Sequence, residues 1–185
     1  MSALQRMDVT GWPPPGPPRA SRGVPLAMRD RYTREAIATL RGTVDADAVT
    51  AVWEAAVAAP AWPGPPVWVH GDMLPGNLLV RQGRLSAVID FAGVGVGDPA
   101  CDLMIAWGLF SGESRDMFRA ALAVDDATWA RGCGWALSQA LIFIPYYLDT
   151  NPVGVANARR TIDEVLADHG ASNRGSLQSR SRWVA

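Results

Sequence analysis

The chain has 185 residues, of which 49% are hydrophobic and 19% are charged, and its formal net charge is −1. This balance is typical of a globular domain that buries its own core, and it lacks the basic excess expected of a nucleic-acid-binding protein. The two cysteines follow no metal-binding or redox spacing, and the first residues do not resemble a signal peptide. The longest apolar run, 135–148, is shorter than the roughly 20 residues that span a membrane, so we expect a cytoplasmic protein.

The first part of the chain is predicted to be an irregular arm followed by two helices. Residues 1–25 contain "GWPPPGPPRASRGVP", and proline has no backbone N–H to donate, so an arm or linker is expected there. Good helix formers predict a helix over 28–41, with Gly42 just past its end. A second helix is predicted over 45–59, with Asp45 as its N-cap.

Short β-strands are predicted in the middle of the chain. A strand at 67–69 runs into a histidine, and two more at 78–81 and 85–90 flank the tripeptide "QGR", whose length and composition suit a tight hairpin. The glycine-rich stretch 91–97 is predicted to be a loop.

The remainder of the chain is predicted to be helical and to end in a disordered tail. Asp98 followed by proline is typical of a helix start, and a polar composition predicts disorder over 169–185. The fold class is therefore α+β, mostly α, with one folded unit over 26–168. The helices expected in this part cover 99–110, 113–122, 125–148 and 152–170.

Three polar residues lie at the ends of the predicted strands, namely Asp72, Asn77 and Asp90. The hairpin should return Asp90 to the loop that carries the other two. Carboxylate and amide oxygens are ligands of hard cations such as Mg²⁺, which takes only one or two protein carboxylates and completes its shell with water and phosphate. One aspartate is then free to accept a proton from a substrate hydroxyl, as phosphoryl transfer requires. The alternative is that these are ordinary turn residues, since Asp and Asn favour turns.

These residues lie in a set of motifs with a known order. "HGDMLPGN" at 70–77 fits the catalytic-loop pattern H-x-D-x-x-x-x-N, "IDF" follows at 89–91, and "GDPACDL" follows at 97–103. Together they resemble the aminoglycoside phosphotransferase family of small-molecule kinases over about 26–168. The resemblance implies a protein-kinase-like C-terminal lobe built around a small β-hairpin.

The resemblance also implies roles for individual residues. Asp72 corresponds to the catalytic base, and Asn77 and Asp90 correspond to ligands of Mg²⁺ in an enzyme that uses ATP or GTP. The acceptor would be a hydroxyl of a small molecule such as an aminoglycoside, another antibiotic, an amino alcohol or a sugar.

Supporting roles are implied for three further residues. His70 would brace the catalytic loop, Asp98 would cap a helix, and Asp102 would accept hydrogen bonds that hold the loop. Gly71 stands where protein kinases usually carry an arginine that binds a phosphorylated activation loop, so a protein substrate is not expected.

The chain lacks one residue that kinase chemistry uses. All 17 basic residues are arginine, so there is no lysine to hold the nucleotide phosphates, and a proline-rich arm stands where an N-terminal β lobe would be. We therefore expect a C-terminal lobe without its N-terminal lobe, weakly active or inactive alone. A separate N-lobe chain or self-association through an apolar interlobe face are the expected partners. A non-catalytic remnant that binds nucleotide and Mg²⁺, and a Mg²⁺-dependent hydrolase, remain alternative interpretations.

Overall fold

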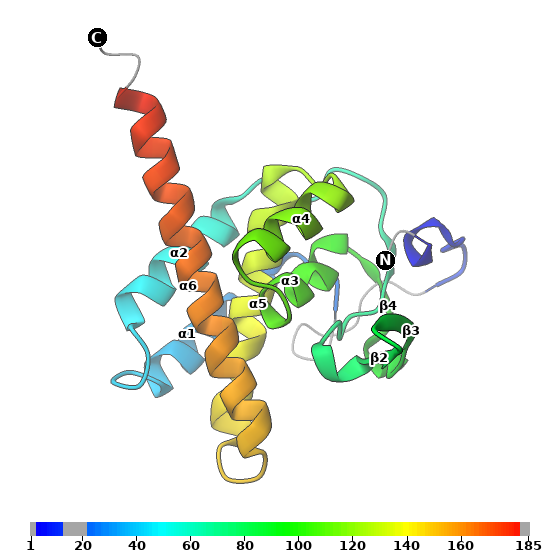
Figure 1. Ribbon diagram of the computed structural model, residues 1–185, viewed down its shortest axis with the longest axis horizontal. Coiled ribbons are helices and arrows are strands. Elements are labelled where there is room, and N and C mark those ends of the chain that lie inside the picture. The colour runs from blue at the N-terminus through cyan, green and yellow to red at the C-terminus, as the bar shows by residue number, and fades with distance from the viewer. Residues whose placement is uncertain (1–2, 13–21, 182–185) are drawn as a thin grey trace.

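The computed structural model describes residues 3–12 and 22–181, and within them the chain is mostly helical with two small antiparallel sheets (Figure 1). The helices are α1 (Asp30–Thr39), α2 (Ala46–Ala58), α3 (Ile105–Gly108), α4 (Gly112–Leu122), α5 (Asp126–Tyr147) and α6 (Pro152–Ser181). The strands are β1 (Val67–Val69), β2 (Leu78–Arg81), β3 (Arg84–Val88) and β4 (Gly95–Gly97). Short 3₁₀ turns are η1 (Leu4–Arg6), η2 (Leu26–Arg29), η3 (Pro75–Asn77), η4 (Phe91–Gly93) and η5 (Pro99–Met104).

Side-chain caps start the helices that build the core. Asp45 accepts the backbone N–H of Ala48 at 3.0 Å at the beginning of α2. Asp125 accepts that of Thr128 at 2.7 Å at the beginning of α5. Each bond satisfies a backbone donor that the first turn of a helix leaves without a partner.

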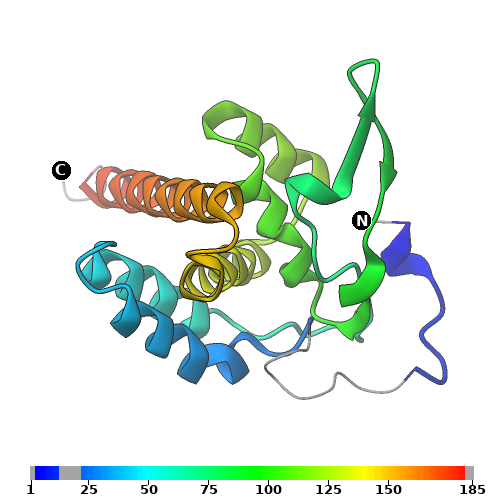
Figure 2. The same cartoon turned by 90° about the horizontal axis from the view of Figure 1, so that it is seen from below.

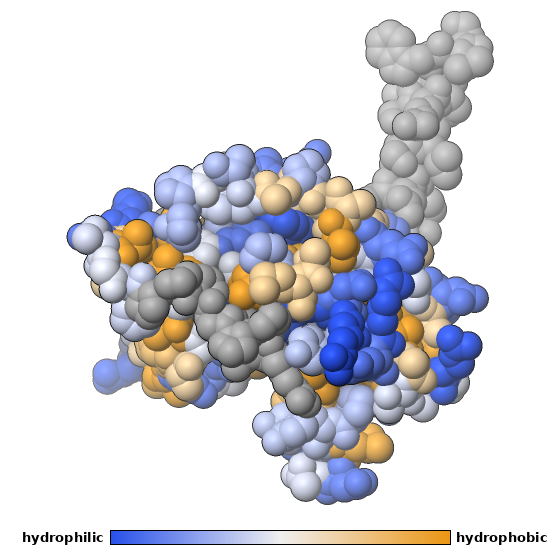
Figure 3. All heavy atoms as spheres, turned by 180° about the vertical axis from the view of Figure 1, so that it is seen from behind, coloured by the Kyte–Doolittle hydropathy of each residue, from blue (hydrophilic) through white to orange (hydrophobic). Residues whose placement is uncertain are grey.

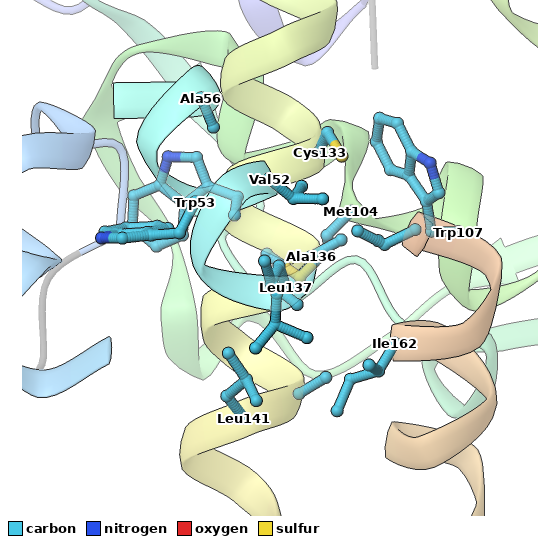
Figure 4. Packing of buried hydrophobic residues seen from close by; sticks show 14 of the residues in the cluster. Val52, Trp53, Ala56, Met104, Trp107, Cys133, Ala136, Leu137, Leu141 and Ile162 are labelled. Atoms are coloured by element: carbon cyan, nitrogen blue, oxygen red, sulfur yellow. The ribbon is translucent and has the colours of Figure 1, made fainter. Parts of the chain in front are cut away.

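Helix α5 is the centre of the core. It contacts α1, α2, α6 and η5, and most of its residues from Thr128 to Ile144 are buried. Figure 4 shows side chains of α2, α5, α3 and α6 meeting around it. This burial accounts for the apolar run of the sequence as far as Ile144. Among the described residues, no helix is both long and apolar enough to cross a bilayer.

The two sheets lie at one side of the helical body, and the β2–β3 hairpin projects from it (Figure 2). Its turn residues, Gln82 and Gly83, have φ angles of 52° and 73°. Positive φ at both central positions is the geometry of a two-residue hairpin turn, so the predicted hairpin is confirmed. The surface in Figure 3 mixes hydrophilic and hydrophobic residues, with the hydrophobic ones in separate patches.

The structure corrects three expectations. The stretch 91–97 is not all loop, because β4 pairs antiparallel with β1 through Val67 and Gly97. Helix α6 continues to Ser181, so the segment from residue 169 onward begins as helix where disorder was predicted. The helix expected after Asp98 starts as the 3₁₀ turn η5 and becomes α-helical only in α3.

The described part of the N-terminal arm, residues 3–12, lies against the sheet. The indole Nε1 of Trp68 in β1 donates to the carbonyl oxygen of Asp8 at 2.8 Å. The rings of Trp12 and Trp68 lie 4.5 Å apart between centroids. Residues 3–12 therefore pack onto β1, and much of the proline-rich stretch, 13–21, lies outside the described residues.

Candidate active site

The loop that follows β1 is held by a buried carboxylate. Asp102, which is fully buried in η5, accepts the backbone N–H of His70 at 2.9 Å and that of Gly71 at 2.8 Å. Burial raises the pKa of Asp102, and the two backbone hydrogen bonds oppose this rise by stabilising the charged form. Asp102, the residue expected to support the loop, therefore contacts the loop backbone directly.

The side chain of His70 connects the loop to the segment that leads into Asp90. Its Nδ1 accepts the backbone N–H of Asp72 at 3.3 Å, and its Nε2 lies 3.0 Å from the carbonyl oxygen of Ile89. These contacts suit the tautomer in which Nε2 carries the proton and donates it to Ile89. The ring is buried and packs on Phe91 with centroids 4.6 Å apart. His70 is therefore positioned to brace the loop.

Asp72 and Asn77 are joined across the loop by hydrogen bonds. The Nδ2 of Asn77 donates to the carbonyl oxygen of Asp72 at 2.8 Å and to its carboxylate Oδ2 at 3.2 Å. Between them, η3 makes one tight turn that starts at Pro75. The Asp72 side chain remains 25% exposed, so its carboxylate is restrained and still open to a ligand.

Asp90 lies next to this loop in an unusual backbone conformation. The backbone N–H of Ile89 donates to the carbonyl oxygen of Asn77 at 2.9 Å, which brings the end of the hairpin back to the loop. Asp90 has φ 62° and ψ 67°, a left-handed conformation that costs a non-glycine residue about 1–2 kcal/mol. Its carboxylate accepts the N–H of Ala92 at 3.4 Å and is exposed. Such an outlier is a common feature of functional sites.

A cavity of about 290 Å³ opens beside the loop, between it and helices α5 and α6. Asp72 and Asn77 line it, whereas Asp90 is not part of its wall. The other walls combine apolar side chains such as Phe143 with the neutral polar side chains of Gln139 and Asn157. The cavity is thus large enough for part of a small organic molecule, with the Asp72 carboxylate at its edge.

Asp98 is placed at a helix start away from the cavity. Its Oδ1 accepts the backbone N–H of Ala100 at 2.9 Å, as expected of an N-cap. Its carboxylate also forms a buried ion pair with Arg131 of α5, with 2.7 Å between Oδ2 and Nε. Asp98 therefore ties η5 to the core.

Comparison with known proteins identifies the family. A model of the APH family, described as the phosphotransferase enzyme family, matches residues 3–135. The chain belongs to the APH phosphotransferase family. The match begins upstream of the resemblance noted in the motifs and includes the N-terminal arm.

Solved structures of phosphotransferases share the fold. Macrolide 2'-phosphotransferase type I matches with a TM-score of 0.53 and 20% identity, covering 90% of this chain and 55% of that one. A thermostable mutant of aminoglycoside phosphotransferase APH(4)-Ia matches with a TM-score of 0.50 and 22% identity, covering 91% of this chain and 62% of that one. The chain thus spans somewhat more than half of the length of these structures. No curated protein matches it.

Two side chains at the 70–77 loop and the end of the hairpin have the chemistry of magnesium ligands. Asn77 and Asp90 present an amide oxygen and a carboxylate on adjacent backbone segments, and both are hard oxygen donors. Within the part of the chain that the structure describes, no three His, Cys, Asp or Glu side chains form a metal-binding group. A Mg²⁺ site with few protein ligands, completed by water and phosphate oxygens, fits this donor set.

One positively charged side chain at the site, that of Arg22, was not predicted from the sequence. Arg22, which lies just before the first helix, places its guanidinium NH2 3.4 Å from the Asp72 carboxylate Oδ1 and its NH1 3.2 Å from the Gln139 Oε1. These contacts join residues 50 and 117 positions apart in the chain. No local pattern around Arg22 indicates them, because they arise only from tertiary packing.

Proposed function

We propose that this chain carries the catalytic loop of a phosphotransferase that moves the γ-phosphoryl group of ATP or GTP to a hydroxyl of a small molecule. The observation that carries the proposal is the pairing of Asp72 with Asn77 on a loop whose backbone is held by Asp102, at the edge of a cavity. Membership of the APH family supports the same reaction.

In this proposal Asp72 acts on the acceptor. An acceptor bound in the cavity presents its hydroxyl to the Asp72 carboxylate, which receives the proton as the oxygen attacks the phosphorus. The hydrogen bond from Asn77 restrains that carboxylate, so little reorganisation is needed during the reaction.

Asn77 and Asp90 act on the donor. In the proposal both would hold Mg²⁺, which would neutralise charge on the nucleotide phosphates. His70 joins the backbone of the two segments, so it fixes the separation between the base and the metal-binding carboxylate.

The acceptor is proposed only as a class. The solved structures of similar fold include a macrolide 2'-phosphotransferase and an aminoglycoside phosphotransferase, but identities of 20% and 22% show shared fold alone. Function depends on the site rather than on the fold. A small molecule with a free hydroxyl fits the cavity and the position of Asp72.

Binding of a non-hydrolysable ATP analogue to the purified chain, measured by isothermal titration calorimetry with and without Mg²⁺, tests this proposal. We expect binding that requires Mg²⁺ and that weakens at least about tenfold in Asp90→Asn and in Asn77→Ala, because the first change removes the negative charge of a metal ligand and the second removes a ligand oxygen. The exposed Asp116 of α4 supplies a matched control, and Asp116→Asn should bind as the unaltered chain does.

Binding that is independent of Mg²⁺, or equal in Asp90→Asn and Asp116→Asn, would contradict the proposed site. The absence of lysine favours a second candidate, a nucleotide–Mg²⁺-binding module without turnover. That candidate makes the same binding prediction and is separated from the first by an assay of phosphoryl transfer.

A further inference from the structure

Two arginines lie side by side between the catalytic loop and helix α5. Arg22 NH1 and Arg29 NH2 both donate to the Oε1 of Gln139, at 3.2 Å and 3.5 Å. Two guanidinium groups thus share one neutral amide oxygen. We propose that Arg22 and Arg29 form a binding site for the carboxylate or phosphate of the acceptor, beside the Asp72 that receives its hydroxyl proton. The acceptor part of this inference rests on the proposed phosphotransferase function.

The two positive charges of Arg22 and Arg29 are not matched by two carboxylates among the described residues. Arg22 has a carboxylate neighbour in Asp72 at 3.4 Å, but Arg29 makes no ion pair in the described part of the chain. Residues 1–2, 13–21 and 182–185, which the structure does not describe, contain no Asp or Glu side chain. The Arg29 guanidinium instead donates from Nε to the Ser138 hydroxyl at 2.9 Å and stacks on the Trp135 ring at 4.5 Å.

Burial makes this excess of positive charge costly. Arg29 is only 3% exposed, and the Arg22 side chain is 17% exposed. Burial, followed by the charge of Arg22, lowers the pKa of Arg29 to about 10. The Arg22 Nε is buried and has no hydrogen-bond partner among residues 3–12 and 22–181. A bound anion would supply both the missing charge and an acceptor for this donor.

There is space for a ligand at the pair. A cavity of about 500 Å³ between α1 and α5 is lined by both arginines and by aromatic side chains, including Tyr146 and Tyr147. Among the described residues, Glu35 is the one carboxylate in that lining, and it pairs with Arg31 at 2.9 Å in an exposed position. A bound anion would therefore meet the buried Arg29 and the partly buried Arg22.

This cavity adjoins the one that contains Asp72. Gln139 and Phe143 line both cavities, and Arg22 contacts Gln139 on one side and Asp72 on the other. A short molecule held by its anionic end at the arginines can place a hydroxyl at the Asp72 carboxylate. The same two cations would repel a polycationic acceptor. The expected acceptor class is thus a hydroxy acid or a phosphorylated alcohol.

Ligand binding followed by NMR chemical-shift changes in the purified full chain tests the site without requiring turnover. The probes are 3-hydroxybutyrate, its methyl ester, which keeps the hydroxyl and loses the charge, and inorganic phosphate. We expect the acid to bind at least about tenfold more tightly than the ester, and phosphate to compete with the acid. Arg22→Gln should weaken binding of the acid at least about tenfold, whereas Arg41→Gln, at an exposed position, should not.

Several outcomes would overturn the site. Equal binding of acid and ester would overturn it, because the charge would then not matter. Equal effects of Arg22→Gln and Arg41→Gln would also overturn it. So would a failure of both the acid and phosphate to bind. Arg29 is buried, so Arg29→Gln is expected to destabilise the fold and the Arg22→Gln variant decides the test. Arg29→Lys, which keeps the charge, should retain part of the affinity.

The anion bound by the two arginines has two possible sources, the acceptor and a phosphate of the donor nucleotide. A non-hydrolysable ATP analogue with Mg²⁺ distinguishes between them. Simultaneous binding of this analogue and the acid supports the acceptor assignment. Displacement of the acid by the analogue, dependent on Arg22, would overturn that assignment in favour of the nucleotide. If the analogue does not bind while the acid does, the phosphotransferase proposal fails and the anion site stands.

Discussion

Gly71 shows how a single residue is required by the geometry of the site. It has a φ of +79°, and a side chain at this position would overlap with the carbonyl oxygen of Gly93 and with the aliphatic part of Arg22. The close approach lets its N–H, with that of His70, reach the carboxylate of Asp102. Glycine is therefore needed here for both conformation and space.

Replacing Gly71 should destabilise the chain far more than replacing another glycine of the same loop. We expect Gly71→Ala to lower the free energy of unfolding by at least about 2 kcal/mol, because alanine disfavours positive φ and meets backbone that cannot move freely. Gly76→Ala is the control, since a methyl group there meets nothing within 4 Å. Urea denaturation of the two variants measures the difference, and equal stabilities would show that the loop adapts without cost.

At the scale of elements, a buried ion pair joins η5 to α5. Arg131 of α5 donates from Nε to the Asp98 carboxylate at 2.7 Å, from NH2 to the Thr128 hydroxyl at 3.2 Å, and from NH1 to the carbonyl oxygen of Pro60. Element η5 also carries Asp102, which holds the backbone of the 70–77 loop. The ion pair therefore fixes this supporting element to the central helix α5.

Removing one partner of this pair should be costly because it leaves the other charge buried. We expect Arg131→Met to lower the free energy of unfolding by about 3–5 kcal/mol. The exposed pair between Arg119 and Asp126 is the comparison, and Arg119→Met should cost at most about 1 kcal/mol. Thermal or urea unfolding of both variants gives the result, and a cost for Arg131→Met below that of Arg119→Met would contradict the role of the buried pair.

At the scale of the whole molecule, α5 connects the parts that build the site. Helix α5 contacts α1, α2, α6 and η5. The helices that line the two cavities therefore share a single core. Apolar side chains remain exposed on and after the hairpin. They are Leu79, Val80, Leu85, Ile89 and Phe91.

The 185-residue chain by itself should turn over ATP poorly. Phosphoryl transfer depends on positioning and charge stabilisation, and this chain has no lysine to hold the nucleotide phosphates. With hydroxyl acceptors present, we expect ADP release at least about 10²-fold slower than the roughly 1–100 per second typical of kinases. A coupled assay measures it, with Asp72→Asn as the blank. Rapid release that is abolished by Asp72→Asn would show that the chain needs no lysine for catalysis.

The sequence alone determined the features that depend on neighbouring residues. The caps at Asp45 and Asp98, and the hairpin turn at 82–83, follow from short-range rules of backbone hydrogen bonding and φ preference. The spacing of the motifs at 70–77 and 89–91 indicated the family, which the match to its model confirmed.

The tertiary structure decided what depends on residues far apart in the chain. Strand β4 was missed because its partner β1 lies about 30 residues earlier, and glycine has little strand preference of its own. The contacts of Asp102 with the loop backbone and of Arg22 with Asp72 arise only when the core brings η5 and the N-terminal arm to the same loop. The sequence therefore determined which residues could carry the chemistry. Packing decided that the carboxylate expected to act as the base would lie 3.4 Å from the guanidinium group of Arg22.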